Sequence, residues 1–479
     1  MPAVEEFGVE PIPAELRTVG WRDLFAINFT FYLSPLTYVL GALAVTAGGL
    51  PLWWAVGAML AGQVLAFACL VLVAQPGVDY GLPGQVALRA TLGFWGARLL
   101  SSPYRVVAGM YWFAAQALAC ALGFQALFEG LTGDHLPLVP IAVVSAAAYG
   151  TLAVLGFDVM RYLLRVVLPL TLVFTGVIVG LYVSTDNPSF QVDRVFDSPD
   201  QHFTWVGFAT FVTVMAGAGL TFVTNIADWC RYTPTRRDMR IGFIASALAS
   251  AVVTTFVGGY AAVATGKTNP FVALVDLTSS KPLLVVLLVA IVAQTVGPNI
   301  TNVYTAGLSL VNSIPHLGRL RATLLVAAAS VALSAFPDIV NHAQKWITHL
   351  RNVAAPLTGV ILVDYLLLKR QRIDVPALFD PKGRYRYLGG VNAAALAAVA
   401  VGVAVYYSLP HDWLKVVWGI GVGAAAYLVL SWLQARAAES HLVRARLKPG
   451  TQWRRSPSQE APDHRMAAKV SSQRSSSPS

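Results

Sequence analysis

The chain has 479 residues, of which 56% are hydrophobic and only 12% are charged, and its mean hydropathy is +0.61. Soluble domains carry roughly 25% charged residues, so this composition excludes an ordinary soluble protein. The formal charge of +10 does not indicate nucleic-acid binding, because +6 of it lies in residues 436–479, where a basic tail suits the surface of an anionic membrane.

Twelve apolar stretches follow one another along the chain, separated by short polar connections. Each is near or above the roughly 20 residues that a helix needs to cross a hydrocarbon core. We therefore predict an all-α polytopic membrane protein with twelve transmembrane helices. The predicted spans are residues 24–48, 52–75, 103–128, 136–156, 162–184, 203–227, 241–264, 283–313, 322–340, 346–368, 388–409 and 413–434.

The basic residues fall mainly in alternate connections. The connections on the same side as the N-terminus hold 17 Lys and Arg, with Arg105 counted in the connection before span three. The connections on the other side hold six. The positive-inside rule then places both termini in the cytoplasm, and we expect a plasma-membrane protein. The predicted organisation is a cytoplasmic segment at 1–23, a transmembrane domain at 24–434 and a disordered cytoplasmic tail at 435–479.

Ionisable groups are almost absent from the middles of the predicted spans. A charged solute would need a buried counter-charge, which this pattern does not provide. Aromatic rings, amides and hydroxyls suit an uncharged, flat, hydrogen-bonding solute, although the same groups also serve helix packing. Trp112 and Gln116 are four residues apart and therefore share one helix face. The groups in question are Trp112, Gln116, Thr221, Phe222, Asn225, Gln294, Thr295, Asn299 and Asn302.

Helix-breaking residues lie inside three spans: Ser34-Pro35 in span one, Gly217-Ala218-Gly219 in span six and Gly297-Pro298 in span eight. Pro removes a backbone donor and Gly weakens a helix. Spans one and six are five apart, where two inverted five-helix repeats would place matching discontinuous helices. Ordinary kinks are the alternative, because Pro and Gly are frequent in membrane helices.

Five short motifs, in the correct order, resemble the nucleobase and cation symporter family 1, which includes cytosine, purine, allantoin and hydantoin permeases. The resemblance covers residues 15–435. Its motifs are Tyr80-Gly81-Leu82-Pro83 with Arg89 to Gly93, YWFAAQ at Tyr111 to Gln116, NIADWCRY at Asn225 to Tyr232, PNITNVYTAGL at Pro298 to Leu308, and Pro356, Gly359 and Asp364-Tyr365 followed by Lys369-Arg370.

The resemblance implies a leucine-transporter-type fold, with two inverted repeats of five helices plus two C-terminal helices, and transport by alternating access. It implies that Trp112 stacks on the substrate, while Gln116 and Asn299 hydrogen-bond it. The family's second aromatic position aligns with Gly219, and Phe222 is the candidate substitute.

The resemblance also implies cation coupling. Sodium-coupled members use carbonyls of span one and two adjacent hydroxyls of span eight, whereas this chain has Gln294-Thr295 in span eight. The coupling ion is therefore either Na⁺, held near Asn28 and Thr295, or H⁺.

These observations predict a secondary transporter that imports a neutral nitrogen heterocycle together with Na⁺ or H⁺, without a cofactor and as a monomer. One alternative is an amino-acid transporter of the same fold, in which the ends of broken helices hold the zwitterion. A membrane enzyme or a channel is the other alternative. The sequence contains no HExxH, P-loop or GxSxG motif and no repeated filter segment, which argues against it.

Overall fold

The computed structural model describes residues 7–197, 201–410 and 412–446, with the backbone alone for 341–348, 350, 351 and 437–446. Within these residues the regular structure is helical, apart from an isolated bridge between Leu388 and Val391. The longer helices are α1 (Trp21–Tyr32), α2 (Pro35–Thr46), α3 (Leu52–Val73), α8 (Ser102–Thr132), α9 (Leu138–Val154), α10 (Phe157–Ser184), α12 (Trp205–Leu220), α14 (Arg236–Thr265), α16 (Lys281–Ser313), α17 (Gly318–Ser334), α18 (Pro337–Leu362), α20 (Ala393–Ser408) and α21 (Lys415–Arg446).

Short helices form the connections between the longer ones and continue some of them. The α-helical segments are α4 (Gln75–Tyr80), α5 (Gly84–Ala87), α6 (Arg89–Leu92), α7 (Phe94–Gly96), α11 (Val192–Phe196), α13 (Ala227–Cys230), α15 (Pro270–Leu274) and α19 (Val375–Phe379). The π-helical turns are η2 (Ala97–Ser101) and η6 (Val363–Leu368). The 3-10 turns are η1 (Ala14–Leu16), η3 (Pro188–Phe190), η4 (Thr221–Thr224), η5 (Pro315–Leu317) and η7 (Arg384–Arg386).

Most of the predicted spans are long apolar helices. Among the described residues, eight helices are long and apolar enough to cross a membrane, and the bent pair of α1 and α2 makes a ninth. The other three predicted spans fall on shorter apolar helices, Leu138–Val154, Asn352–Leu368 and Ala393–Ser408. The all-helical, membrane-spanning architecture is confirmed, while the count of twelve crossings and the five-plus-five repeat stay predictions.

The helix breaks agree only partly with the sequence prediction. The axes of α1 and α2 differ by 60°, and Pro35 is the first residue of α2, so the break in span one is confirmed. In span six, α12 stays helical through Gly217 and Gly219, and the helix tightens into η4 only at Thr221. The expected break at Gly297-Pro298 is wrong, because α16 runs continuously from Lys281 to Ser313. Gly297 instead permits close packing, since a Cβ there would lie 2.8 Å from the Thr30 carbonyl oxygen.

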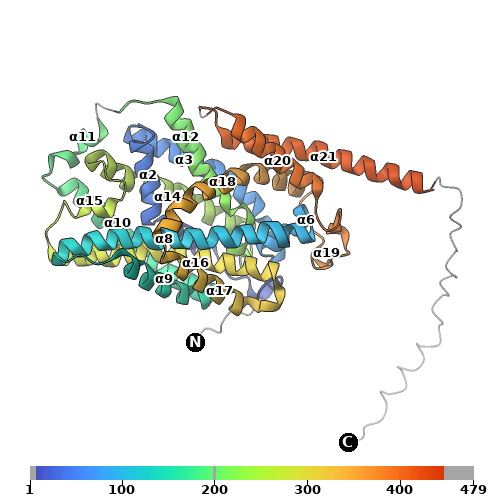
Figure 1. Cartoon of the computed structure of the whole chain (residues 1–479), viewed down its shortest axis with the longest axis horizontal. Coiled ribbons are helices and arrows are strands. Elements are labelled where there is room, and N and C mark those ends of the chain that lie inside the picture. Colours follow the sequence, from blue (N-terminus) through green and yellow to red (C-terminus); the bar gives the residue numbers. More distant parts are fainter. Residues whose placement is uncertain (1–6, 198–200, 411, 447–479) are drawn as a thin grey trace, which may run out of the picture. The chain divides into compact units, whose positions relative to one another are not determined.

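Helices α8 and α16 lie side by side along much of their length, and α9 and α17 pack against the pair (Figure 1). Small residues bring these helices close together. A Cβ on Gly109 of α8 would lie 2.7 Å from the Cβ of Ala306 on α16. On the other side, α14 packs on α1, α2 and α3, and α12 packs on α3. The bend between α1 and α2 is therefore held within a close-packed helical core.

Large apolar side chains cover outward faces of the helices. Val144 on α9 and Val166 and Val173 on α10 are each more than 60% exposed. Hydrocarbon accepts such side chains without the cost that water would impose, and helices satisfy their own backbone hydrogen bonds. The surface chemistry thus supports a lipid-embedded protein.

The C-terminal part differs from the predicted tail in its helix content. Helix α21 continues to Arg446, beyond residue 435, at which the disordered tail was predicted to begin. The chain divides into two compact units at Ser431, and in the second unit the guanidinium carbon of Arg436 lies 3.9 Å from the centroid of the Trp432 ring. Most of the predicted tail, residues 447–479, lies outside the described residues.

Candidate functional site

A cavity of about 340 Å³ opens beside the bend between α1 and α2. This volume is at the lower end of the roughly 300–1,000 Å³ that is typical of small-molecule sites. Three segments contribute most of its walls: the α1–α2 bend, α8, and the end of α12 with η4; α16 adds Asn302. The lining includes Phe31, Tyr32, Thr37, Arg105, Trp112, Gln116, Ala218, Thr221, Phe222 and Asn302.

Helix α8 presents Trp112 and Gln116 to this cavity, one turn apart. Gln116 is 4% exposed, and its amide nitrogen donates a hydrogen bond to the Ser34 hydroxyl at 3.2 Å. Ser34 lies in the bend and shares a second hydrogen bond of 3.0 Å with Thr37. The predicted recognition pair therefore lies beside the interrupted helix, as the sequence prediction requires.

An aromatic wall faces the cavity from the other side. The Phe222 ring in η4 meets Phe31 edge-on, with centroids 4.9 Å apart, and contacts the buried Trp229 at 5.0 Å. Phe222 thus lines the same cavity as Trp112. Gly219, which the resemblance aligns with the family's second aromatic, is not among the lining residues, and a Cβ there would lie 2.7 Å from Ala66.

Helix α16 contributes Asn302 to the cavity rather than Asn299. Asn299 is fully buried, and neither polar atom of its side chain has a hydrogen-bond partner among the described residues. The structure therefore brings together Trp112, Gln116 and Phe222, while Asn299 and Gly219 remain behind the cavity wall.

Arg105 is the functional candidate that sequence reasoning missed. It was counted with the cytoplasmic connection, but it lies in α8, is 1% exposed and lines the cavity. Arg105 is the fourth residue of α8, so it belongs to the helix and not to the connection with which it was counted. The spacing did hold a signal, because Arg105 precedes Trp112 by seven residues, or two helical turns, and so shares its face.

The side chains of the two residues proposed for the cation have hydrogen-bond partners on different helices. The Asn28 amide nitrogen donates to the Ser246 hydroxyl of α14 at 2.7 Å. The Thr295 hydroxyl donates to the Ile291 carbonyl at 2.8 Å and lies beside Cys120 and Tyr149, on the α8 and α9 side. In the part of the chain that the structure describes, no group of three or more His, Cys, Asp or Glu side chains could hold a metal ion.

The N-terminal segment 7–20 packs against the ends of predicted spans two and six. Arg17 donates to the carbonyls of Ile12 and Val78, each at 2.9 Å, and the Ile12 amide donates to the Gly81 carbonyl at 3.0 Å. Burial lowers the pKa of the Arg17 guanidinium, and the Asp79 carboxylate opposes this shift. Fully buried Arg231, next to the end of α13, donates to the Gly8 carbonyl at 2.8 Å. These bonds join the segment to the ends of spans two and six.

Asp228 stabilises the same region. Its Oδ1 accepts a hydrogen bond of 2.7 Å from the Gly84 amide at the start of α5. A Cβ on Gly84 would lie 2.5 Å from the Thr224 carbonyl oxygen, so the connection after span two is pressed against η4. The side-chain partner of Asp228, which the sequence could not identify, is therefore a backbone amide on a neighbouring connection.

A second buried cluster surrounds Asp364 at the end of span ten. Asp364 pairs with Lys369 and accepts hydrogen bonds from the hydroxyls of Thr91 at 2.7 Å and Tyr427 at 2.8 Å. Burial lowers the pKa of the Lys369 ammonium, with Asp364 acting in the opposite direction.

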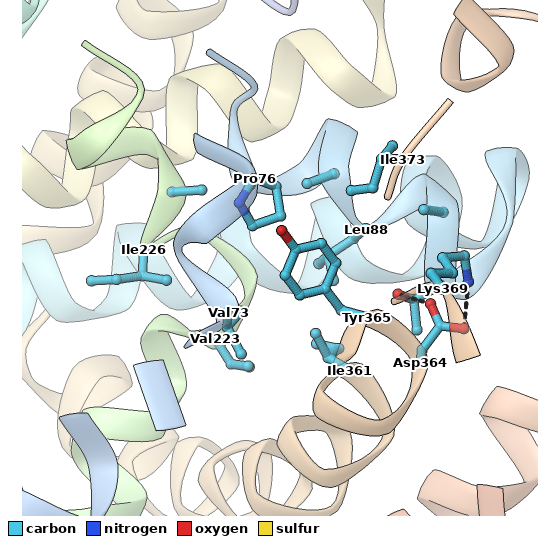
Figure 2. A pocket seen from close by; sticks show the side chains of 15 residues that line it. Val73, Pro76, Leu88, Val223, Ile226, Ile361, Asp364, Tyr365, Lys369 and Ile373 are labelled. Atoms are coloured by element: carbon cyan, nitrogen blue, oxygen red, sulfur yellow. Dashed lines mark hydrogen bonds and ion pairs between the residues drawn. The ribbon is translucent and has the colours of Figure 1, made fainter. Parts of the chain in front are cut away.

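A small cavity lies next to this cluster. Figure 2 shows the Asp364–Lys369 pair on one side of it and the Tyr365 ring extending toward Pro76. Its volume of about 20 Å³ is enough for roughly one water molecule, so it is not a substrate site.

Comparison with known proteins identifies the family. Residues 11–433 match the model of a family described as permease for cytosine/purines, uracil, thiamine and allantoin. The hydantoin permease of Microbacterium maritypicum is 24% identical over 82% of this chain and 82% of its own length. The allantoin permease of Bacillus subtilis strain 168 is 23% identical, over 86% of this chain and 89% of its own length.

Solved structures show the same fold. Mhp1, a nucleobase-cation-symport-1 family transporter in a closed conformation with bromovinylhydantoin bound, gives a TM-score of 0.78 at 21% identity, covering 91% of this chain and 97% of Mhp1. The inward-facing conformation of Mhp1 gives a TM-score of 0.75 at 21% identity, covering 91% of this chain and 95% of that chain. The family match covers most of the chain, which confirms the resemblance drawn from its motifs. The chain therefore belongs to the family of permeases for cytosine/purines, uracil, thiamine and allantoin.

Proposed function

We propose that the protein imports a neutral nitrogen heterocycle of the cytosine, purine, allantoin or hydantoin type, coupled to Na⁺ or H⁺, by alternating access. The observation that carries this proposal is the cavity at the α1–α2 bend, which Trp112, Gln116 and Phe222 line together. An indole and a phenyl ring offer stacking faces, while the Gln116 amide offers hydrogen bonds to the edge of a ring. Family membership makes the amino-acid alternative the weaker one.

For the coupling ion we retain Asn28 and Thr295 as candidate ligands. The side-chain oxygen of Asn28 is buried without a hydrogen-bond partner in the described residues, which leaves it available to a cation. Oxygen donors of this kind are what Na⁺ and similar hard cations select. If NaCl raises the affinity for a heterocycle and choline chloride does not, the result supports Na⁺ as the coupling ion. If only a lower pH raises the affinity, the result supports H⁺.

The transport proposal is tested by uptake of labelled uracil, cytosine, adenine, hypoxanthine, allantoin and hydantoin into cells that lack their own carriers. We expect at least one of them to accumulate and to be competed by unlabelled heterocycles but not by free amino acids. Normal membrane expression without accumulation of any compound would count against the proposal.

We also propose plasma-membrane insertion with both termini in the cytoplasm, and a monomer as the functional unit.

A further inference from the structure

Arg105 and Asn302 form a hydrogen-bonded pair in the wall of the cavity. The Nη2 of Arg105 on α8 donates to the Asn302 Oδ1 on α16 at 3.1 Å and to the Thr305 hydroxyl at 2.7 Å. Both paired side chains line the cavity, and each is 1% exposed. The pair therefore joins the two central helices directly beside the bound molecule that we propose.

This contact fixes the orientation of the Asn302 amide. A guanidinium has only donors, so the amide must turn its oxygen toward Arg105 and leave its NH₂ group for another partner. In the described residues neither this nitrogen, Nδ2, nor the Nε of Arg105 has a hydrogen-bond partner, although both are buried. The hydrogen-bonded pair thus carries two buried donors without a partner among the described residues.

The guanidinium carbon of Arg105 lies over the Phe222 ring, 6.0 Å from its centroid, and no close counter-charge faces it among the described residues. Asp228 is the acid whose charge acts on Arg105, but its Oδ1 is hydrogen-bonded to the Gly84 amide. A guanidinium that is buried without a counter-charge is costly, and an electronegative group on a ligand would offset that cost.

We infer that Arg105 and Asn302 select heterocycles that present a ring carbonyl to this wall, and reject analogues that present an amino group there. This inference rests on the proposed function. A carbonyl oxygen has two lone pairs and can accept from the Arg105 Nε–H and the Asn302 Nδ2–H. An exocyclic amino group would place its own N–H donors against the Arg105 Nε–H and the Asn302 Nδ2–H, and both of these donors would stay without a hydrogen bond. Uracil and hypoxanthine are the oxo members, and cytosine and adenine the amino members, of two pairs matched in size.

Binding of these four bases to the purified full-length protein, measured by thermal shift and by competition, tests the inference. We expect each oxo member to bind at least about tenfold more tightly than its amino partner, because polar sites discriminate strongly against a mismatched hydrogen-bonding group. Equal binding within both pairs would overturn the inference while leaving the proposed function intact. Absence of binding by all four bases, and by allantoin and hydantoin, would overturn the proposed function as well.

Two variants sharpen the test. Asn302→Asp keeps the acceptor for Arg105 but replaces the free donor with an acceptor, so the oxo-to-amino preference should fall by about tenfold or more. Arg105→Lys keeps the positive charge but removes the Nε–H, and it should lower the preference as well. The ratio within one variant is independent of its expression level. An unchanged ratio in a folded Asn302→Asp or Arg105→Lys protein would overturn the inference.

Discussion

The amide nitrogen of Gln116 lies 3.2 Å from the Ser34 hydroxyl, to which it donates a hydrogen bond. This contact connects the cavity-lining face of α8 to the bend at which α1 ends and α2 begins. A substrate that binds Gln116 would thereby be linked to the α1–α2 pair, whose axes differ by 60°. The contact connects the cavity to a discontinuous helix, the kind of element that forms substrate sites in secondary transporters.

Gln116→Met should raise the apparent KM for uptake about 2- to 13-fold, because one hydrogen bond contributes roughly 0.5–1.5 kcal/mol. Ser34→Ala removes the same contact from the other side. If Gln116 acts through Ser34, the double variant should be no worse than Gln116→Met alone. Fully additive effects in this cycle would show that the two residues act independently.

Trp112→Ala should weaken substrate binding about 5- to 150-fold, since stacking on an aromatic side chain contributes roughly 1–3 kcal/mol. Trp112→Phe is the matched control, because it keeps an aromatic face, and it should retain most of the affinity. Apparent affinities from uptake, corrected for surface expression, provide the measurement. Wild-type affinity in Trp112→Ala would place the stacking site elsewhere.

Arg17→Ala should loosen the N-terminal segment from the helix ends on which it packs. It removes the hydrogen bonds to the carbonyls of Ile12 and Val78. Loss of about 1.4 kcal/mol would raise the population of open states tenfold. Native Cys230 is fully buried, precedes Arg231, which donates to the Gly8 carbonyl of this segment, and serves as the reporter. Its maleimide labelling should accelerate about tenfold, whereas a Cys230→Ala protein should lose that signal. Unchanged labelling would mean that the segment does not control access.

Asp364→Asn should lower the melting temperature by several degrees. The change leaves the buried Lys369 ammonium without its counter-charge, and breaking a buried ion pair from one side costs roughly 3–5 kcal/mol. Lys369→Met added to Asp364→Asn should recover much of the loss, because no unpaired charge remains. Thermal unfolding in detergent measures both. A double variant less stable than Asp364→Asn would show that the lysine does more than neutralise the carboxylate.

Most of the architecture was predictable from the sequence because its signals are local. Each span was recognised from its own apolar length, without knowledge of its neighbours. The bend at Ser34-Pro35 was also a local prediction, since Pro cannot continue the hydrogen bonding of a preceding helix. The face shared by Trp112 and Gln116 followed from helical periodicity alone, and the cavity contains both residues.

Only the tertiary structure decided which polar residues line the cavity, because sequence does not fix how each helix rotates about its own axis. Asn299 and Asn302 differ by three residues, or about 60° around α16, and packing against α8 turned Asn302 toward the cavity. Arg105 falls inside predicted span three but was counted with the preceding connection, and only the structure placed it beside Asn302. Hydropathy records how apolar a residue is. It does not record the contacts that make a buried charge tolerable. For Arg105 such a contact comes from Asn302 on another helix, 197 residues away in the sequence.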